Sequence, residues 1–137
     1  MIGAAALLAV LLPLQAAAQA PDRITLYCGG GVSGGGGGAI AQGDGTLIRT
    51  SRASATAPVM EEALPGRMAP TARWHALLDA ARFETLQSGP RGANTCSLSR
   101  RRGGSAHGLG WRGPGVPAEM PAALRQVVEE MQAAVRD

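Results

Sequence analysis

The stretch CGGGVSGGGGG, Cys28–Gly38, places eight glycines among eleven residues. It follows RITLYC, residues 23–28, in which Ile24, Leu26 and Cys28 occupy alternate positions, the pattern of a half-buried β-strand. Glycine adopts positive φ and lets a second backbone approach closely, so the run predicts a wide hairpin turn or a bulged strand pair. A mobile loop tip is the alternative.

Within this run, Gly29–Gly34 matches the G-x-G-x-x-G pattern of dinucleotide-binding loops. That pattern holds a pyrophosphate only where the third glycine opens a helix and an acidic residue follows about 20 positions later. Here more glycines and an Asp-Gly turn follow, and the sequence has no lysine for a Walker loop. We therefore expect no cofactor. Gly30, Gly31 and Ser33 are instead candidate partner-binding residues, because backbone N–H groups in such a run can hold an anion or pair with an extended peptide.

Two more segments predict paired strands. Residues 39–42 and 46–51 flank Gly43-Asp44-Gly45, and Asp-Gly is a strong turn signal. Residues 96–111 alternate on both sides of Arg102-Gly103-Gly104 and predict a second hairpin. Between these pairs, residues 52–70 contain three prolines and no clean period, which predicts a surface connection with at most one short helical turn.

Apolar residues recur at helical spacing in two segments, residues 71–86 and 121–135, so we expect two amphipathic helices. Antiparallel strand pairs with helices packed on one face make an α+β domain. The sequence therefore predicts a small antiparallel sheet of four to five strands with two amphipathic helices on one face, in the order ββ(β)-α-ββ-α.

The first twenty residues carry no charge and run from an apolar stretch into small residues, the layout of a secretory signal peptide. Cleavage is expected after Ala18 or Ala20, which leaves residues 21–137 as a single exported domain in the periplasm or outside the cell. An uncleaved membrane anchor is the alternative, because the apolar span is nearly long enough to cross a bilayer.

The chain has two cysteines, Cys28 and Cys96. In an exported protein a single pair most often forms a structural disulfide, and both residues share the inward phase of their predicted strands. We therefore predict a Cys28–Cys96 disulfide.

The charge balance is mildly basic, with 13 basic residues, all arginine, and a net charge of +3. The one cluster is Arg100, Arg101 and Arg102, which we expect at a solvated hairpin tip, where arginines discourage edge pairing. These three are the second group of candidate partner-binding residues, for an acidic partner or an anionic surface. A nucleic-acid partner is not expected, because it needs a broader basic face interleaved with aromatic residues.

Two histidines, His75 and His107, are the remaining residues with catalytic chemistry. Neither belongs to an H-x-x-H motif or a carboxylate cluster, so no metal site is predicted. A cysteine–histidine hydrolase would need a reduced thiol, which the predicted disulfide removes. We therefore predict that the protein is not an enzyme and has no catalytic residues.

The order of these segments is similar to that of emfourin-like domains, small inhibitors of thermolysin-like metalloproteases. The resemblance covers roughly residues 23–131 and rests on the strand with its glycine-rich segment, the Gly-Asp-Gly turn, a helix ending at Phe83 and a closing helix with Pro121 and Leu124. These are markers of fold and identify no inhibitory residues. The resemblance implies a protease-inhibitor-like module.

Together these observations predict an exported, non-enzymatic binding or accessory domain whose partner is an exported or envelope protein. The alternative is an envelope attachment domain that uses the Arg100–Arg102 hairpin. Contact with a membrane through a span of the chain is expected only if the leader is retained.

Overall fold

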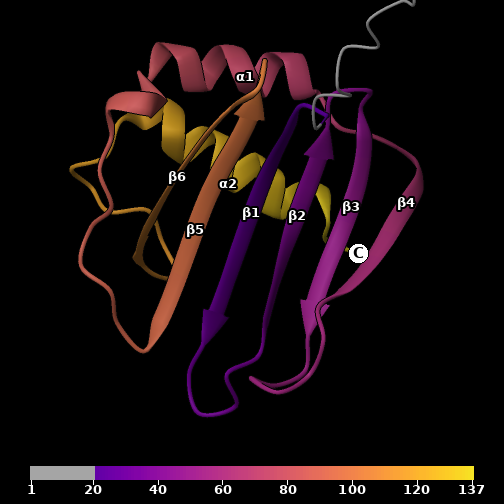
Figure 1. Ribbon diagram of the computed structural model, residues 1–137, viewed down its shortest axis with the longest axis vertical. Helices are drawn as coiled ribbons and strands as arrows, with labels where there is room; N and C mark the ends of the chain where they lie inside the picture. Colours follow the sequence, from indigo (N-terminus) through magenta and orange to yellow (C-terminus); the bar gives the residue numbers. More distant parts are fainter. Residues whose placement is uncertain (1–20) are drawn as a thin grey trace, which may run out of the picture.

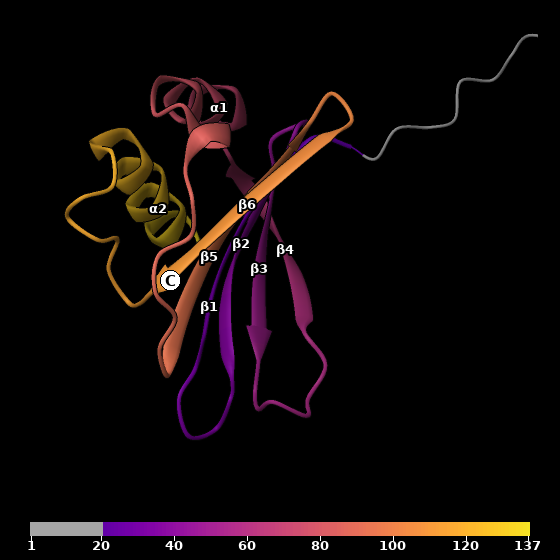
Figure 2. The same ribbon diagram turned by 60° about the vertical axis from the view of Figure 1, so that its left-hand side comes forward.

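The computed structural model describes residues 21–137, and the predicted signal peptide lies outside the described residues. One six-stranded antiparallel sheet, in the order β4-β3-β2-β1-β5-β6, carries both helices on one face (Figures 1 and 2). The elements are β1 (Arg23–Gly30), β2 (Gly36–Gln42), β3 (Thr46–Arg52), β4 (Met60–Met68), α1 (Thr71–Ala80), the 3-10 turn η1 (Phe83–Thr85), β5 (Asn94–Arg102), β6 (Ser105–Arg112) and α2 (Ala122–Ala134). Neither described helix is long and apolar enough to cross a membrane.

The sheet has six strands, so the prediction of four to five strands is wrong, although the α+β class holds. The missed strand is β4, which lies inside the segment predicted as a surface connection, residues 52–70. It pairs with β3 through a bulge, since Thr46 lies opposite Met68 while Ile48 lies opposite Ala63. Pro65 falls within the bulged part of this edge strand, where the lack of an N–H group is tolerated.

The predicted first helix is shorter than its sequence pattern. α1 stops at Ala80, and Arg82 adopts the left-handed conformation with φ of 54° before the 3-10 turn at Phe83. Thr71 is the first helical residue and donates through its hydroxyl to the Gln42 carbonyl at 2.7 Å, which fixes the helix start against the end of β2.

The glycine-rich segment is a β-hairpin, as the sequence analysis predicted. β1 ends at Gly30, a five-residue connection follows, and β2 begins at Gly36, so the run spans a turn and the first part of a strand. Gly38 lies so close to β1 that a Cβ there would overlap the backbone carbonyl of Leu26.

We expect Gly38→Ala to lower the free energy of unfolding by about 1–3 kcal/mol, because the added methyl forces β1 and β2 apart. Gly115→Ala is the matched control, since a Cβ at Gly115 meets nothing within 4 Å. Urea unfolding measures both. A Gly38→Ala protein as stable as the control would show that the two strands can separate at no cost.

The core lies between the helices and one face of the sheet. Its largest fully buried side chains include Trp74 of α1, Trp111 of β6 and Phe83 of η1, which are between 0% and 1% exposed. The sheet contributes Ile24, Leu26, Leu47, Leu98 and Leu109, and α2 contributes Leu124, Val127, Val128 and Met131. Within residues 21–137, the opposite face of the sheet carries no helix (Figure 2).

Cys28 and Cys96 form a disulfide, which confirms the predicted pairing. The two residues lie directly opposite each other on the neighbouring strands β1 and β5, with Cα atoms 4.0 Å apart. The bond therefore ties the glycine hairpin to the second half of the chain.

Candidate functional site: the glycine hairpin end of the sheet

The turn of the glycine hairpin, Gly31–Gly35, has a defined backbone. Gly30, Gly31 and Gly34 have φ values of 120°, 71° and 68°, a region that side chains other than glycine rarely adopt. The Gly30 N–H donates to the Gly35 carbonyl at 3.0 Å, and the Gly35 N–H donates to the Ser33 hydroxyl at 3.2 Å. These hydrogen bonds favour a turn of defined conformation over the mobile loop tip, which was the alternative expected from the sequence.

Two neighbouring segments brace this turn from either side. The Gly31 N–H donates to the carbonyl of Ala93, just before β5, at 2.8 Å. The carbonyl of Ser33 accepts from the N–H of Ala55, in the β3–β4 loop, at 3.0 Å. With the disulfide at Cys28 only two residues before Gly30, the hairpin is held at its base and on both flanks.

Exposed apolar side chains gather at this end of the sheet. Val32 stands at the tip of the turn and is fully exposed at 110%, and Val59 and Met60 at the start of β4 are 48% and 62% exposed. The turn and the β3–β4 loop project together at one end of the sheet (Figure 2). We call this surface, made of residues 31–35 and 53–60, the hairpin end.

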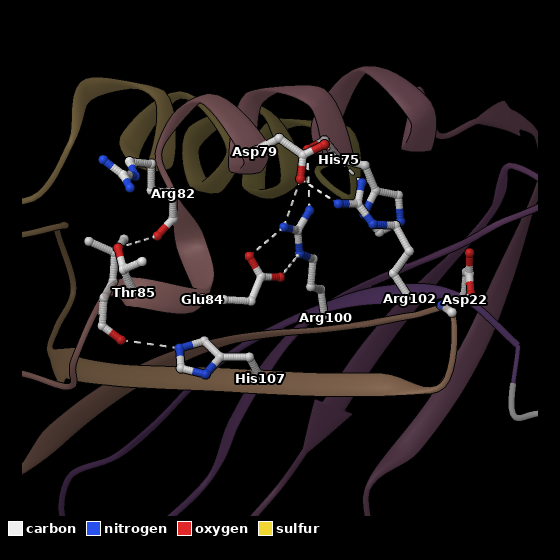
Figure 3. Close-up of polar contacts among 11 residues, drawn as sticks. Asp22, His75, Asp79, Arg82, Glu84, Thr85, Arg100, Arg102 and His107 are labelled. Carbon is white, nitrogen blue, oxygen red and sulfur yellow. Dashed lines mark hydrogen bonds and ion pairs between the residues drawn. The ribbon is translucent and has the colours of Figure 1, made fainter.

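The sequence-predicted partner-binding residues fall at two opposite ends of the sheet. Gly31 and Ser33 belong to the hairpin turn and Gly30 is the last residue of β1 before it, whereas Arg100–Arg102 lie where β5 ends, beside α1 (Figures 1 and 3). They therefore do not form one site. Sequence reasoning missed Val32, although a single apolar residue inside a glycine-rich run was a signal that could have found it.

Arg100 is buried, so the expectation of a solvated arginine cluster is wrong for this residue. Its side chain is 2% exposed and donates to Glu84 at 2.6 and 2.7 Å and to Asp79 at 2.8 Å (Figure 3). It also donates to the His75 carbonyl at 3.3 Å and lies 5.6 Å from the Phe83 ring centre. The guanidinium points inward because Arg100 lies on the same face of β5 as the buried Leu98 and Cys96. Its contacts with Asp79 and Glu84 link β5 to α1 and η1.

Arg102 is more exposed and also pairs with Asp79, which accepts from it at 2.9 Å. The hydrogen bond from Arg102 is the main cause that lowers the pKa of Asp79 to about 2, and Arg100 adds to it. Asp79 and Glu84 thus neutralise much of the positive charge of Arg100–Arg102. Arg101 points to the other face of the sheet and is outside this network.

The two histidines, His75 and His107, pack against other parts of the fold. His107 contacts the Leu86 carbonyl through Nε2 at 3.1 Å and packs edge-on against the Phe83 ring. His75 is 8% exposed, and its two ring nitrogens have no hydrogen-bond partner among the described residues. Within residues 21–137 no group of three or more His, Cys, Asp or Glu side chains is placed to hold a metal ion, and both cysteine sulfurs are in the disulfide.

Burial lowers the pKa of His75, and the charges of Arg102 and Arg100 lower it further. The neutral ring is therefore favoured in the folded state, while the unfolded chain takes up a proton near the ordinary value of about 6.5. The contribution of this lowered pKa to the free energy of unfolding is fully present above about pH 6.5. It is lost as the pH falls below that value, by at most about 1.4 kcal/mol per pH unit. The lowered pKa of Asp79 removes stability only further down, as the pH falls from its ordinary 3.8 toward about 2.

We expect urea midpoints of the wild-type protein to fall between pH 7 and 5, and those of His75→Leu to fall less. The leucine variant keeps the apolar contacts of the buried ring and removes the titrating group. Parallel curves for the two proteins would mean that another group carries the pH dependence.

Comparison with known proteins finds that no family model and no curated protein matches the chain. The emfourin-like resemblance therefore stays a prediction from the sequence.

Proposed function

We propose that the protein is an exported, non-enzymatic binding module that docks onto an exported or envelope protein through the hairpin end. The observation that carries this proposal is the fully exposed Val32 on a turn that is braced by Ala93, Ala55 and the disulfide. A rigid scaffold that presents an apolar side chain to water is a typical arrangement of a recognition loop.

The physical reason is preorganisation. A loop that is already fixed loses little conformational freedom on binding, so more of the contact energy appears as affinity. Burying a valine side chain contributes about 1.5–3 kcal/mol, and the glycines around Val32 leave it reachable from several directions. Val59 and Met60 are further exposed apolar side chains of the hairpin end.

The sharper form of this proposal is a protease-inhibitor-like module. A narrow, rigid turn suits insertion into an enzyme cleft, and the emfourin-like resemblance names thermolysin-like metalloproteases as the class to test. The alternative, surface attachment through the Arg100–Arg102 hairpin, has weaker support, because Arg100 and Arg102 are already paired with Asp79 and Glu84.

The test is a pull-down from envelope and culture fractions with oxidised protein as bait, repeated with Val32→Asp. Met68→Asp is the matched control, since Met68 is 76% exposed and lies at the opposite end of β4. A near-stoichiometric partner that binds the wild type and Met68→Asp, and binds Val32→Asp about ten-fold or more weakly, is the expected result. A purified thermolysin-like metalloprotease, assayed with the same three proteins, tests the inhibitor form.

An empty pull-down, or a partner that binds Val32→Asp as well as the wild type, would overturn the hairpin end as the binding site. A partner without any effect on the metalloprotease would leave the binding module in place and remove the inhibitor form.

A further inference from the structure

Arg23 of β1 and Arg101 of β5 lie directly opposite each other. Their neighbours Ile24 and Arg100 are buried toward the helices, so both arginines point to the open face of the sheet. Like charges directly opposite each other destabilise a strand pair. Within residues 21–137 neither guanidinium has a carboxylate partner, in contrast to the inward-facing Arg100.

Two hydroxyl groups lie next to this arginine pair. Thr25 and Ser99 are also directly opposite each other, two residues further along the same strands and on the same face. The four side chains border a hollow of about 250 Å³. Gly108 of β6 lies opposite Ser99 and has no side chain, so the hollow stays open toward the edge of the sheet.

We infer that this hollow binds a phosphate group. A guanidinium group has N–H donors in one plane, spaced so that two of them can donate to two oxygens of one phosphate. Two guanidinium groups and two hydroxyl groups can therefore donate hydrogen bonds to a tetrahedral anion from several directions. A dianion also removes the repulsion between Arg23 and Arg101. A carboxylate has one charge and two oxygens, so it satisfies this set of donors less completely.

The phosphate group can come from two sources, free phosphate in solution or the phosphomonoester headgroup of a lipid such as phosphatidic acid. Both can reach an open sheet face that no described helix covers. The hollow is also separate from the hairpin end, since Arg23 and Arg101 lie at the opposite ends of β1 and β5 from Gly30 and Asn94. Binding there does not depend on the proposed partner site.

The test measures the thermal stability of the oxidised protein, and its amide NMR shifts, as inorganic phosphate replaces chloride at constant ionic strength. We expect phosphate to raise Tm and to move the amide signals of Thr25 and Ser99. Arg101→Gln is expected to bind phosphate about ten-fold or more weakly, because it loses a charge-assisted fork. Without phosphate, Arg101→Gln should be at least as stable as the wild type, which separates lost binding from misfolding.

Arg112→Gln is the matched control, since Arg112 lies opposite Thr95 at the far end of the same face and its removal lowers the net charge equally. A second arm compares sedimentation with vesicles that contain phosphatidic acid and with phosphatidylcholine vesicles. Response to free phosphate identifies a soluble phosphate ligand, and response to phosphatidic acid alone identifies the headgroup; both support the site if they need Arg101. No response in either arm, or equal losses in Arg101→Gln and Arg112→Gln, would overturn it.

Discussion

Loss of the Cys28–Cys96 disulfide is expected to lower the free energy of unfolding by about 4 kcal/mol. The two cysteines are 68 residues apart in sequence, and a cross-link over a loop of that length restricts the unfolded chain strongly in the chain-entropy model. The native strands are already in register at this point, because Cys28 and Cys96 are paired on β1 and β5. Removing the bond therefore stabilises the unfolded state while the folded sheet keeps its ladder.

The variant for this experiment is Cys28→Ala/Cys96→Ala, because Cys96 is 1% exposed and a serine would bury a hydroxyl there. Thermal unfolding should show a Tm lower by on the order of 15 °C than that of the oxidised wild type. The reduced wild type should show a similar loss. A loss in the alanine variant with none on reduction would point to a packing defect and would contradict the entropic account.

Much of the central sheet could be predicted from the sequence because its strands are half buried. Ile24 and Leu26 on β1, and Cys96 and Leu98 on β5, alternate with polar residues, and this alternation fixed which side chains face the core. The same phase placed Cys28 and Cys96 on one face, so the disulfide followed from the sequence as well.

The edge strand β4 could not be predicted in the same way. Residues 60–63 are exposed on both sides, so no apolar alternation exists to be recognised. Pro65 and Gly66 are ordinary loop signals, and only the pairing with β3 makes them a bulge in a strand. Strand pairing is tertiary information, which local patterns do not contain.

The candidate sites were predictable only in part, for a related reason. The glycine run identified the hairpin turn and its backbone groups, but the exposure of Val32 depends on how Ala55 and Ala93 brace the turn. The three consecutive arginines read as one cluster in sequence. In the sheet, alternation sends Arg100 to the core and Arg101 to the open face, so neighbours in sequence have different roles.

Arg100→Leu is expected to lower the free energy of unfolding by about 3 kcal/mol, at the low end for a broken buried ion pair. The leucine fills part of the space, but Asp79 and Glu84 lose the cation between them and the His75 carbonyl loses a donor. Both carboxylates are about half exposed, at 47% and 52%, so water compensates them in part. Urea unfolding at pH 7 measures the loss.

Arg102→Leu is the matched control, because Arg102 pairs with the same Asp79 while its side chain is 42% exposed. An exposed ion pair contributes less than about 1 kcal/mol, so this variant should stay close to the wild type. Arg100→Lys should lie between the two, since an ammonium keeps the charge and cannot reproduce the fork that spans Asp79 and Glu84. Equal losses in Arg100→Leu and Arg102→Leu would mean that net charge, and not the buried fork, holds α1 and η1 against β5.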